Sequence, residues 1–277
     1  MKVATDIGGT FTDLVAIDES GSLILEKAHT TPPNFDQGVM DVLEKSGMDM
    51  KSIDAFFHGT TTIINALTER KGAKTALITT KGFRDILELA RGNRPDLFNM
   101  VCEKPTPFVP RYLRREVTER ISYKGDILTP LSEEDICTAV EYLKKEQVEA
   151  IAVCYINSYA NEEHERKTVE KIKELWPEVY VCPSVDITKE WREYERTSTA
   201  VLNAYVMPVA SSYLNHLGQR LTDAGVSENR YIMQSNGGTT TFNQAKLTPV
   251  NIVESGPVAG VFGASILGKL IDEPNII

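Results

Sequence analysis

The sequence has few cysteines, no long apolar run and no excess of positive charge over its 277 residues. The four cysteines lie far apart and form no C-x-x-C pair, so the usual zinc and dithiol motifs are excluded and free thiols are expected. No apolar run approaches the roughly 20 residues of a membrane span, and the N-terminus carries Asp6 where a secretion signal would be apolar. We therefore expect a cytoplasmic protein that does not enter a membrane.

Charge and composition narrow the function classes further. Thirty Lys and Arg against 39 Asp and Glu leave a net charge of -9, so no global positive field is available to hold a nucleic acid or an anionic membrane. The 42% hydrophobic and 25% charged residues are typical of a soluble folded chain. At roughly 150 residues per domain, the length predicts one large domain or two modest ones.

The hydrophobic pattern predicts an α/β protein that opens with an antiparallel β-meander. Three short apolar segments, 2–7, 12–17 and 23–28, are separated by the Gly8-Gly9 pair and a second turn. A helix ending at Gly47 follows, and strands then alternate with helices. The later strands are expected at 55–57, 75–79, 150–155, 179–182 and 231–234, and the helices at 63–70, 83–90, 161–176, 197–224 and 258–270.

Three local features qualify this pattern. Residues 115–123 and 127–128 are expected to form a hairpin, and Ser132 is expected to cap a helix because its oxygen can accept from a free N–H group. Pro208 removes a backbone donor and is expected to kink or restart the helix at 197–224. We place a domain boundary near residue 180.

The first motif with chemical potential is Asp6-Ile7-Gly8-Gly9-Thr10-Phe11-Thr12-Asp13. The two glycines let backbone N–H groups approach phosphate oxygens, the hydroxyls of Thr10 and Thr12 add donors, and Asp6 could hold Mg2+ through water. A plain hairpin turn explains a Gly-Gly pair equally well.

The second motif is His58-Gly59-Thr60-Thr61-Thr62, at a junction between a strand and a helix. One threonine could cap the helix, and the remaining hydroxyls, such as that of Thr60, could face a cleft with His58 and bind a substrate carbonyl. His58 could then act as an acid or base. A structural histidine is the alternative.

Two further segments could contact a ligand. Arg91 and Arg94 flank a Gly-Asn turn after a helix and could clamp an anionic group of a substrate, although surface arginines need no such role. Gly237 and Gly238 lie in a turn-rich loop that could line a nucleotide cleft or be only a loop.

Together and in this order, these segments resemble the hydantoinase/oxoprolinase family, of the hydantoinase A and N-methylhydantoinase type, which also includes subunits of ATP-dependent ketone carboxylases. The likeness runs through most of the chain. Its most specific pieces are DIGGTFTD at 6–13, HGTTTIINAL at 58–67, GFRDILELARGNRP at 82–95, REYERTSTAVLNAYV at 192–206, SNGG at 235–238 and ESGP at 254–257.

The resemblance implies a ribonuclease-H-like lobe of the actin-like ATPase superfamily, a mixed sheet with flanking helices, plus the start of a second lobe. Residues 1–180 would be the N-terminal domain of the family, and residues 181–277 would begin its hydantoinase A domain. ATP and Mg2+ would be the cofactors, with Asp6 near the metal and with Gly8, Gly9 and Thr10 on the phosphates. A companion hydantoinase B-type subunit is a further expectation.

In this family, ATP cleavage drives the ring opening of a small cyclic amide, such as a hydantoin or 5-oxoproline, or activates a ketone for carboxylation. The family continues with a second phosphate loop of the Asp-x-Gly-Gly-Thr type, which this sequence lacks. We therefore expect the N-terminal part of a cyclic amidohydrolase that is inactive alone. The alternatives are the ATP-using subunit of an acetone or acetophenone carboxylase and a non-catalytic actin-like fragment.

Overall fold

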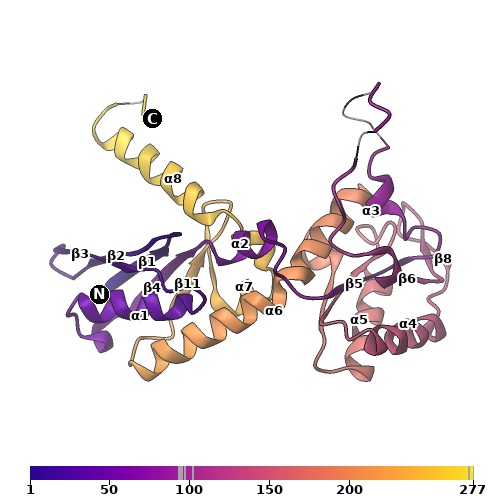
Figure 1. Ribbon diagram of the computed structural model, residues 1–277, viewed down its shortest axis with the longest axis horizontal. Coiled ribbons are helices and arrows are strands. Elements are labelled where there is room, and N and C mark those ends of the chain that lie inside the picture. Colours follow the sequence, from indigo (N-terminus) through magenta and orange to yellow (C-terminus); the bar gives the residue numbers. More distant parts are fainter. Residues whose placement is uncertain (93–95, 97, 102, 274, 277) are drawn as a thin grey trace. The chain divides into compact units, whose positions relative to one another are not determined.

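The structure is a computed structural model that describes residues 1–92, 96, 98–101, 103–273, 275 and 276 (Figure 1). The chain forms two compact units. The first unit joins Met1–Lys71 with Val209–Ile277, and the second is Gly72–Pro208. The boundary predicted near residue 180 is a boundary between family domains of the sequence, not between these compact units, and it stays a prediction. Along the chain, the second unit is inserted between the two segments of the first.

The first unit is built on a mixed sheet of six strands in the order β12-β11-β4-β1-β2-β3. The first three strands form the predicted antiparallel meander, whereas β4 runs parallel to both β1 and β11. The strands are β1 (Lys2–Ile7), β2 (Phe11–Ile17), β3 (Leu23–His29), β4 (Ala55–Thr60), β11 (Arg230–Met233) and β12 (Thr239–Thr241).

The two faces of this sheet have different surroundings. Side chains alternate between buried and exposed along β1 and β2, as the period of two in a strand requires. The helices α1 and α7 and the second half of α6 cover the buried face, while α8 contacts β4 and β11 from the opposite side (Figure 1). These helices are α1 (Phe35–Lys45), α6 (Glu193–Asp223), α7 (Phe242–Leu247) and α8 (Ser255–Leu270), and α2 (Thr62–Thr68) follows β4.

The second unit contains a parallel sheet in the order β10-β9-β5-β6. Its central strands are buried along their whole length, which explains their continuous apolar runs. Ser132 caps α4 as predicted, since its side chain accepts from the Asp135 N–H group at 3.2 Å. The elements are β5 (Thr75–Thr80), α3 (Ile86–Leu89), β6 (Arg114–Val117), β7 (Arg120–Ile121), β8 (Ile127–Thr129), α4 (Glu133–Lys145), β9 (Ala150–Cys154), α5 (Glu163–Leu175) and β10 (Tyr180–Pro183).

Two local predictions were wrong in detail. The predicted hairpin is limited to β7 and β8, because the preceding segment pairs with β5 instead and becomes the sheet strand β6. The helix α6 continues through Pro208, so the predicted restart is wrong, while the alternative of a kink stays a prediction. Ala204, Val206 and Ala210 around this proline are fully buried, so packing on both sides offsets the roughly 3 kcal/mol cost of a proline inside a helix. No helix within the described residues is both long and apolar enough to span a membrane.

Candidate functional site

Asp6 lies near the C-terminal end of β1, on the face of the sheet that α8 approaches. The strand register places it beside Asp13 of β2 and Gly59 of β4. A β-carbon at Gly59 would lie 2.5 Å from Asp6 Oδ1, which is closer than such contacts allow. Gly59 therefore leaves the space that the carboxylate fills. We did not predict this role from the sequence, although a glycine inside a strand is the usual signal of such a close approach.

The surroundings of Asp6 make its negative charge costly. Burial and the neighbouring Asp13 raise the pKa of Asp6 above its usual value. Lys27 Nζ lies 2.9 Å from Asp13 Oδ1 and compensates that carboxylate in part. A β-carbon at Gly256 would lie 3.8 Å and 3.9 Å from the two Asp6 oxygens, so the carboxylate also faces the N-terminal turn of α8.

The loop between β1 and β2 presents free backbone donors. Gly8 N–H donates to the Phe11 carbonyl at 2.9 Å, and Thr30 binds the Gly8 and Thr10 carbonyls through its hydroxyl and its N–H group, each at 2.9 Å. These bonds fix the conformation of the loop. Within the described part of the chain, the N–H groups of Gly9 and Thr10 and the Thr10 hydroxyl have no hydrogen-bond partner. The tip of the loop is thus suited to phosphate oxygens.

Thr12 does not join this donor set. Its side chain is fully buried on the opposite face of the sheet, 3.3 Å from the Thr30 hydroxyl and against Gly38 of α1. Successive side chains of a strand alternate between faces, so Thr12 and Asp13 cannot both point toward the phosphates. The predicted contact of Thr12 with a nucleotide is therefore revised to a structural role.

His58 also lies on the buried face, where we had expected it to face a cleft. Its Nδ1 is 2.9 Å from the Thr5 hydroxyl and its Nε2 is 2.6 Å from the hydroxyl of Tyr213 on α6. His58 is 1% exposed, and this burial lowers the pKa of its imidazole to about 3. The imidazole is therefore neutral with both nitrogens engaged. This geometry supports a structural histidine rather than an acid or base.

The three threonines after Gly59 have partners within the protein. The hydroxyls of Thr60 and Thr62 lie 2.8 Å apart in the buried layer, and Thr60 also accepts from the Thr62 N–H group at 3.1 Å. The Thr61 hydroxyl donates to the Ile7 carbonyl at 3.3 Å and so ties α2 to β1. The expectation that Thr60 faces a cleft was wrong, since this residue is 2% exposed.

Gly237 and Gly238 form the predicted turn, and packing accounts for the glycine at 237. A β-carbon at Gly237, whose φ is +85°, would lie 2.2 Å from the ring of Phe262 on α8. Gly238 N–H donates to Asn236 Oδ1 at 2.8 Å. Ser235 N–H donates to the Asn251 carbonyl at 2.8 Å and anchors the turn. A nucleotide contact of these glycines stays a prediction.

The predicted substrate clamp belongs to the other compact unit. The Arg91 guanidinium forms an ion pair with Glu195, at the start of α6. Arg91 therefore joins two of the sequence motifs, and its role in substrate binding stays a prediction. Arg94 lies outside the described residues.

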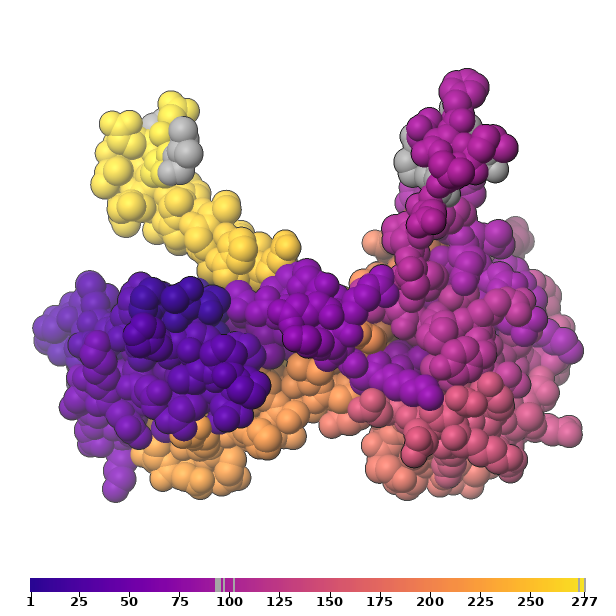
Figure 2. All heavy atoms as spheres, viewed as in Figure 1, coloured from indigo at the N-terminus to yellow at the C-terminus, as the bar shows by residue number. Residues whose placement is uncertain are grey.

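A pocket of about 390 Å³ opens between the outward face of the sheet and the first turns of α8. The space-filling view shows the hollow beneath this helix (Figure 2). Ser255 belongs to its wall, and the buried Ser255 hydroxyl has no hydrogen-bond partner among the described residues. The lining residues are Ala4, Thr5, Asp6, Asp13, Val15, Phe57, His58, Gly59, Met233, Thr239, Ser255, Gly256, Ala259 and Gly260.

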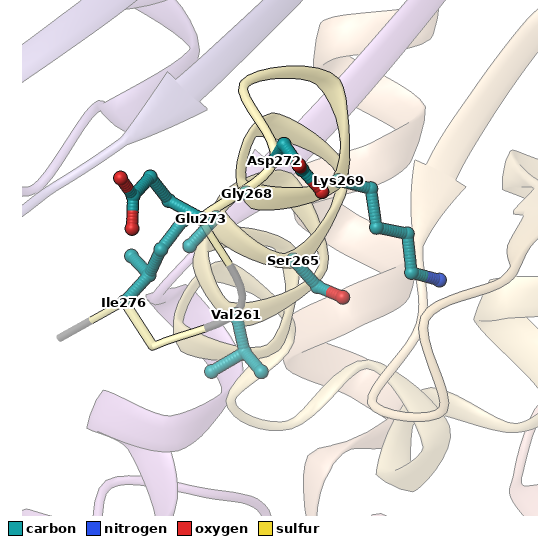
Figure 3. A pocket seen from close by; sticks show the side chains of 8 residues that line it. Val261, Ser265, Gly268, Lys269, Asp272, Glu273 and Ile276 are labelled. Carbon is teal, nitrogen blue, oxygen red and sulfur yellow. The ribbon is translucent and has the colours of Figure 1, made fainter.

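A larger pocket of about 570 Å³ lies along the C-terminal half of α8 (Figure 3). Ser265 and Lys269 line it from the helix, and Glu273 and Ile276 line it from the segment that follows. None of the predicted site residues borders this pocket, so the 390 Å³ pocket is the candidate site.

The donor set around Asp6 is compatible with Mg2+. No group of three or more His, Cys, Asp or Glu side chains gathers at a metal-binding distance among residues that the structure describes. Mg2+ is commonly held by one or two carboxylates together with water and phosphate oxygens. The Asp6 and Asp13 pair beside the loop that we predict to bind phosphate fits that pattern.

Comparisons with known proteins identify the relatives of this chain. A family described as the hydantoinase/oxoprolinase N-terminal region matches residues 2–176, and a second, described as hydantoinase/oxoprolinase, matches residues 196–277. An uncharacterized protein of Methanocaldococcus jannaschii is 40% identical, and the caprolactamase α subunit of Pseudomonas jessenii is 33% identical, each over the whole chain. The chain spans 41% of the length of both.

Two solved structures share the fold. A nucleotide-free acetone carboxylase matches with a TM-score of 0.87 at 27% identity, and the ATP-dependent caprolactamase of Pseudomonas jessenii matches with a TM-score of 0.85 at 31% identity. Each match covers 98% of this chain and 41% of the other. The mixed sheet with flanking helices fits the actin-like ATPase fold expected from the sequence.

Proposed function

Because this chain belongs to the hydantoinase/oxoprolinase family, we propose that it is the nucleotide-binding part of an enzyme that opens a cyclic amide with the cleavage of ATP. The observation that carries the proposal is the position of the Asp6 carboxylate. It lies in the space left by Gly59, at the N-terminal turn of α8 and at the end of the strand that leads into the free donors of Gly9 and Thr10.

Each part of this site has a role toward a bound triphosphate. The N–H groups of Gly9 and Thr10 and the Thr10 hydroxyl would donate to phosphate oxygens without a competing partner in the protein. Asp6, with Asp13 beside it, would hold Mg2+ through water. When bound, the ion supplies positive charge that offsets the charge of the phosphates.

The reaction class follows from the chemistry of an amide, which is a poor electrophile. Attack of the amide oxygen on the terminal phosphorus would form an O–P bond and break the bond to ADP. Water would then add to the ring carbon, and the C–N bond would break with a proton passing to the nitrogen, so that the ring opens to an acyl phosphate. A second water would release phosphate from this acyl phosphate and leave the free acid. In this sequence the loop and Asp6 orient the phosphates, and a companion subunit of the hydantoinase B type completes the enzyme. The α-subunit designation of the caprolactamase relative supports such a partner.

A second candidate is the ATP-using subunit of a ketone carboxylase. The TM-score of 0.87 with acetone carboxylase favours it, because the same loop and carboxylate would serve either phosphorylated substrate. An assay of the assembled enzyme distinguishes the two functions. Labelled bicarbonate would appear in the product of a carboxylase, whereas a hydrolase would release a ring-opened acid without the label.

A titration of the 277-residue chain with Mg-ATP tests the nucleotide site. We expect the amide NMR signals of Gly9 and Thr10 to shift. Asp6→Asn should lower the affinity for Mg-ATP, measured from these shifts, at least tenfold. Asp54→Asn is the matched control, because Asp54 is exposed in the same unit, and its hydrogen bonds and ion pair among the described residues go to Met1 and Asn229. Shifts that avoid this loop, or an unchanged response in Asp6→Asn, would contradict the proposal.

The same pair of variants tests catalysis in the assembled enzyme. Asp6→Asn should abolish the phosphate release that the substrate stimulates, while Asp54→Asn retains it. If the chain binds no nucleotide and Asp6→Asn leaves phosphate release unchanged, the protein is instead a non-catalytic actin-like module.

A further inference from the structure

Thr30, the residue that follows β3, binds the loop between β1 and β2 at two points. Its hydroxyl donates to the Gly8 carbonyl and its N–H group donates to the Thr10 carbonyl, each at 2.9 Å. Between these two carbonyls lie the N–H groups of Gly9 and Thr10, which have no partner among the described residues. Thr30 is 22 residues away from Gly8 along the chain, so the sequence motif around the glycines does not include it.

The hydroxyl of Thr30 sets the direction of the Gly9 N–H group. Gly8 and Gly9 share a trans peptide group, which is planar, with its C=O and N–H bonds pointing in opposite directions. Because the Gly8 oxygen is bound to Thr30, the Gly9 N–H group points away from Thr30. A β-carbon at Gly9 would meet nothing within 4 Å, so the space around this residue is open to a ligand.

The peptide group between Gly8 and Gly9 needs such a restraint because both of its neighbours lack a β-carbon. A flip of the group changes ψ of Gly8 and φ of Gly9, and glycine adopts either sign of φ about equally well. The flipped group would turn the Gly8 oxygen outward, where its partial negative charge would repel a phosphate. The Thr30 hydroxyl stabilises the other orientation, in which the N–H group is outward.

We propose that Thr30 is a positioning residue of the nucleotide site, which keeps the Gly9 N–H group directed at phosphate without contacting the nucleotide itself. The inference rests on the proposed function, because it takes this loop as the phosphate-binding segment. Its physical basis is preorganisation, since a donor that is already fixed in its binding direction loses less conformational freedom when the ligand binds.

Thr12 supports the Thr30 hydroxyl from the buried face of the sheet. The two hydroxyl oxygens lie 3.3 Å apart, and a hydroxyl has a single proton to donate. Since Thr30 donates its proton to Gly8, Thr12 is the donor in this contact. Gly38 of α1 leaves room for it, because a β-carbon there would lie 3.0 Å from the Thr12 oxygen. Two hydroxyls in series thus connect the buried layer to the loop.

Three variants separate the Thr30 hydroxyl from the shape of its side chain. Thr30→Val keeps the shape and removes the donor, whereas Thr30→Ser keeps the donor. Thr31→Val is the matched control, because the Thr31 hydroxyl donates to the Asn34 carbonyl at 2.7 Å and accepts from the Gly38 N–H group at 2.8 Å, outside the loop. Thermal melts should place all three within a few degrees of the wild type. Thr30→Ala takes the place of Thr30→Val if the valine variant does not fold.

Two NMR measurements follow the loop in the 277-residue chain. Without nucleotide, the carbonyl 13C signal of Gly8 reports hydrogen bonding at its oxygen, and this signal should move in Thr30→Val but stay in place in the other two variants. In a titration with Mg-ATP, followed through the amide signals of Gly9 and Thr10, Thr30→Val should lower the affinity at least about tenfold. Thr30→Ser should stay within about threefold of the wild type, and Thr31→Val should bind as the wild type does.

The outcomes separate this inference from the proposed function. If the wild-type loop responds to Mg-ATP and Thr30→Val binds as tightly, the inference is overturned while the nucleotide site stands. An equal loss of affinity in Thr30→Ser or Thr31→Val, or an unmoved Gly8 carbonyl signal in Thr30→Val, would also overturn it. A wild-type loop that does not respond to Mg-ATP would overturn both the inference and the proposed function.

Discussion

Gly59→Ala tests the geometry of the site with the addition of a single methyl group. The new β-carbon would lie 2.5 Å from Asp6 Oδ1 and 3.3 Å from Asp6 Cγ, whereas ordinary contacts begin at 3.4 Å. The backbone of Gly59 does not have a positive φ, so alanine is tolerated there. The carboxylate of Asp6 must rotate away instead.

The expected magnitudes differ for stability and for binding. An off-rotamer side chain costs about 0.5–1.5 kcal/mol, and alanine recovers part of this because glycine is disfavoured inside a strand. We expect the melting temperature to fall by only a few degrees. A misplaced charged hydrogen-bonding group loses about 1.5–3 kcal/mol, which weakens Mg-ATP binding about 10-fold to 150-fold.

Calorimetry with Mg-ATP measures this effect, or NMR titration where binding is weak. Gly263→Ala on α8 is the control, because a β-carbon there meets nothing within 4 Å. On an Asp6→Asn background, Gly59→Ala should cause little further loss, since both changes act through the same carboxylate. Unaltered binding in Gly59→Ala, or full additivity with Asp6→Asn, would refute the reasoning.

Three further predictions concern stability. The pKa of His58 is lowered to about 3 in the fold against about 6.5 in an unfolded chain, so the unfolded state binds more protons between these values. The unfolding free energy should then decrease as the pH falls from about 6.5 to 3, by up to about 1.4 kcal/mol per pH unit. Denaturant titrations at several pH values should show a smaller change of unfolding free energy with pH in His58→Gln. Gly237→Ala should destabilise the protein because its β-carbon would clash with the Phe262 ring at 2.2 Å, and Phe262→Ala should rescue only part of the loss in thermal melts, since the φ of +85° remains strained. Arg196→Leu should lower the unfolding free energy by about 3–5 kcal/mol in chemical denaturation, because it leaves the buried carboxylate of Glu165 without its counter-charge. A matching loss in Glu165→Gln would confirm the coupling of the two residues, whereas a near-neutral Arg196→Leu would contradict it.

The strands of the meander were predictable because local chemistry specifies them. Lys2–Ile7 has the bounds that the sequence predicts, and alternating side chains with glycine between them need no distant partner to form this pattern. Ser132 illustrates the same point, since a cap is a contact within a few residues. The predicted hairpin at 115–128 failed in part because pairing with β5 is a long-range event that competes with local pairing.

The candidate site was only half predictable. The sequence predicts a phosphate-binding loop at Asp6 and the glycines after it, and the free donors of Gly9 and Thr10 are consistent with that prediction. It groups Asp6 with His58 and Thr60, however, and the sheet separates them. The register pairs Asp6 with Gly59 and pairs Thr5 with His58, so the carboxylate and the imidazole lie on opposite faces.

The sequence by itself determined the order of most elements and the family, and it predicts which residues bind phosphate, because periodicity, turn chemistry and motif spacing are properties of neighbouring residues. Only the tertiary structure decided which side chains meet. The parallel register of β1 and β4 placed Gly59 against Asp6, and the approach of α8 enclosed the apolar pocket beside that carboxylate. A shift of one residue between two strands turns every side chain to the other face, and contacts far apart in the chain set that register.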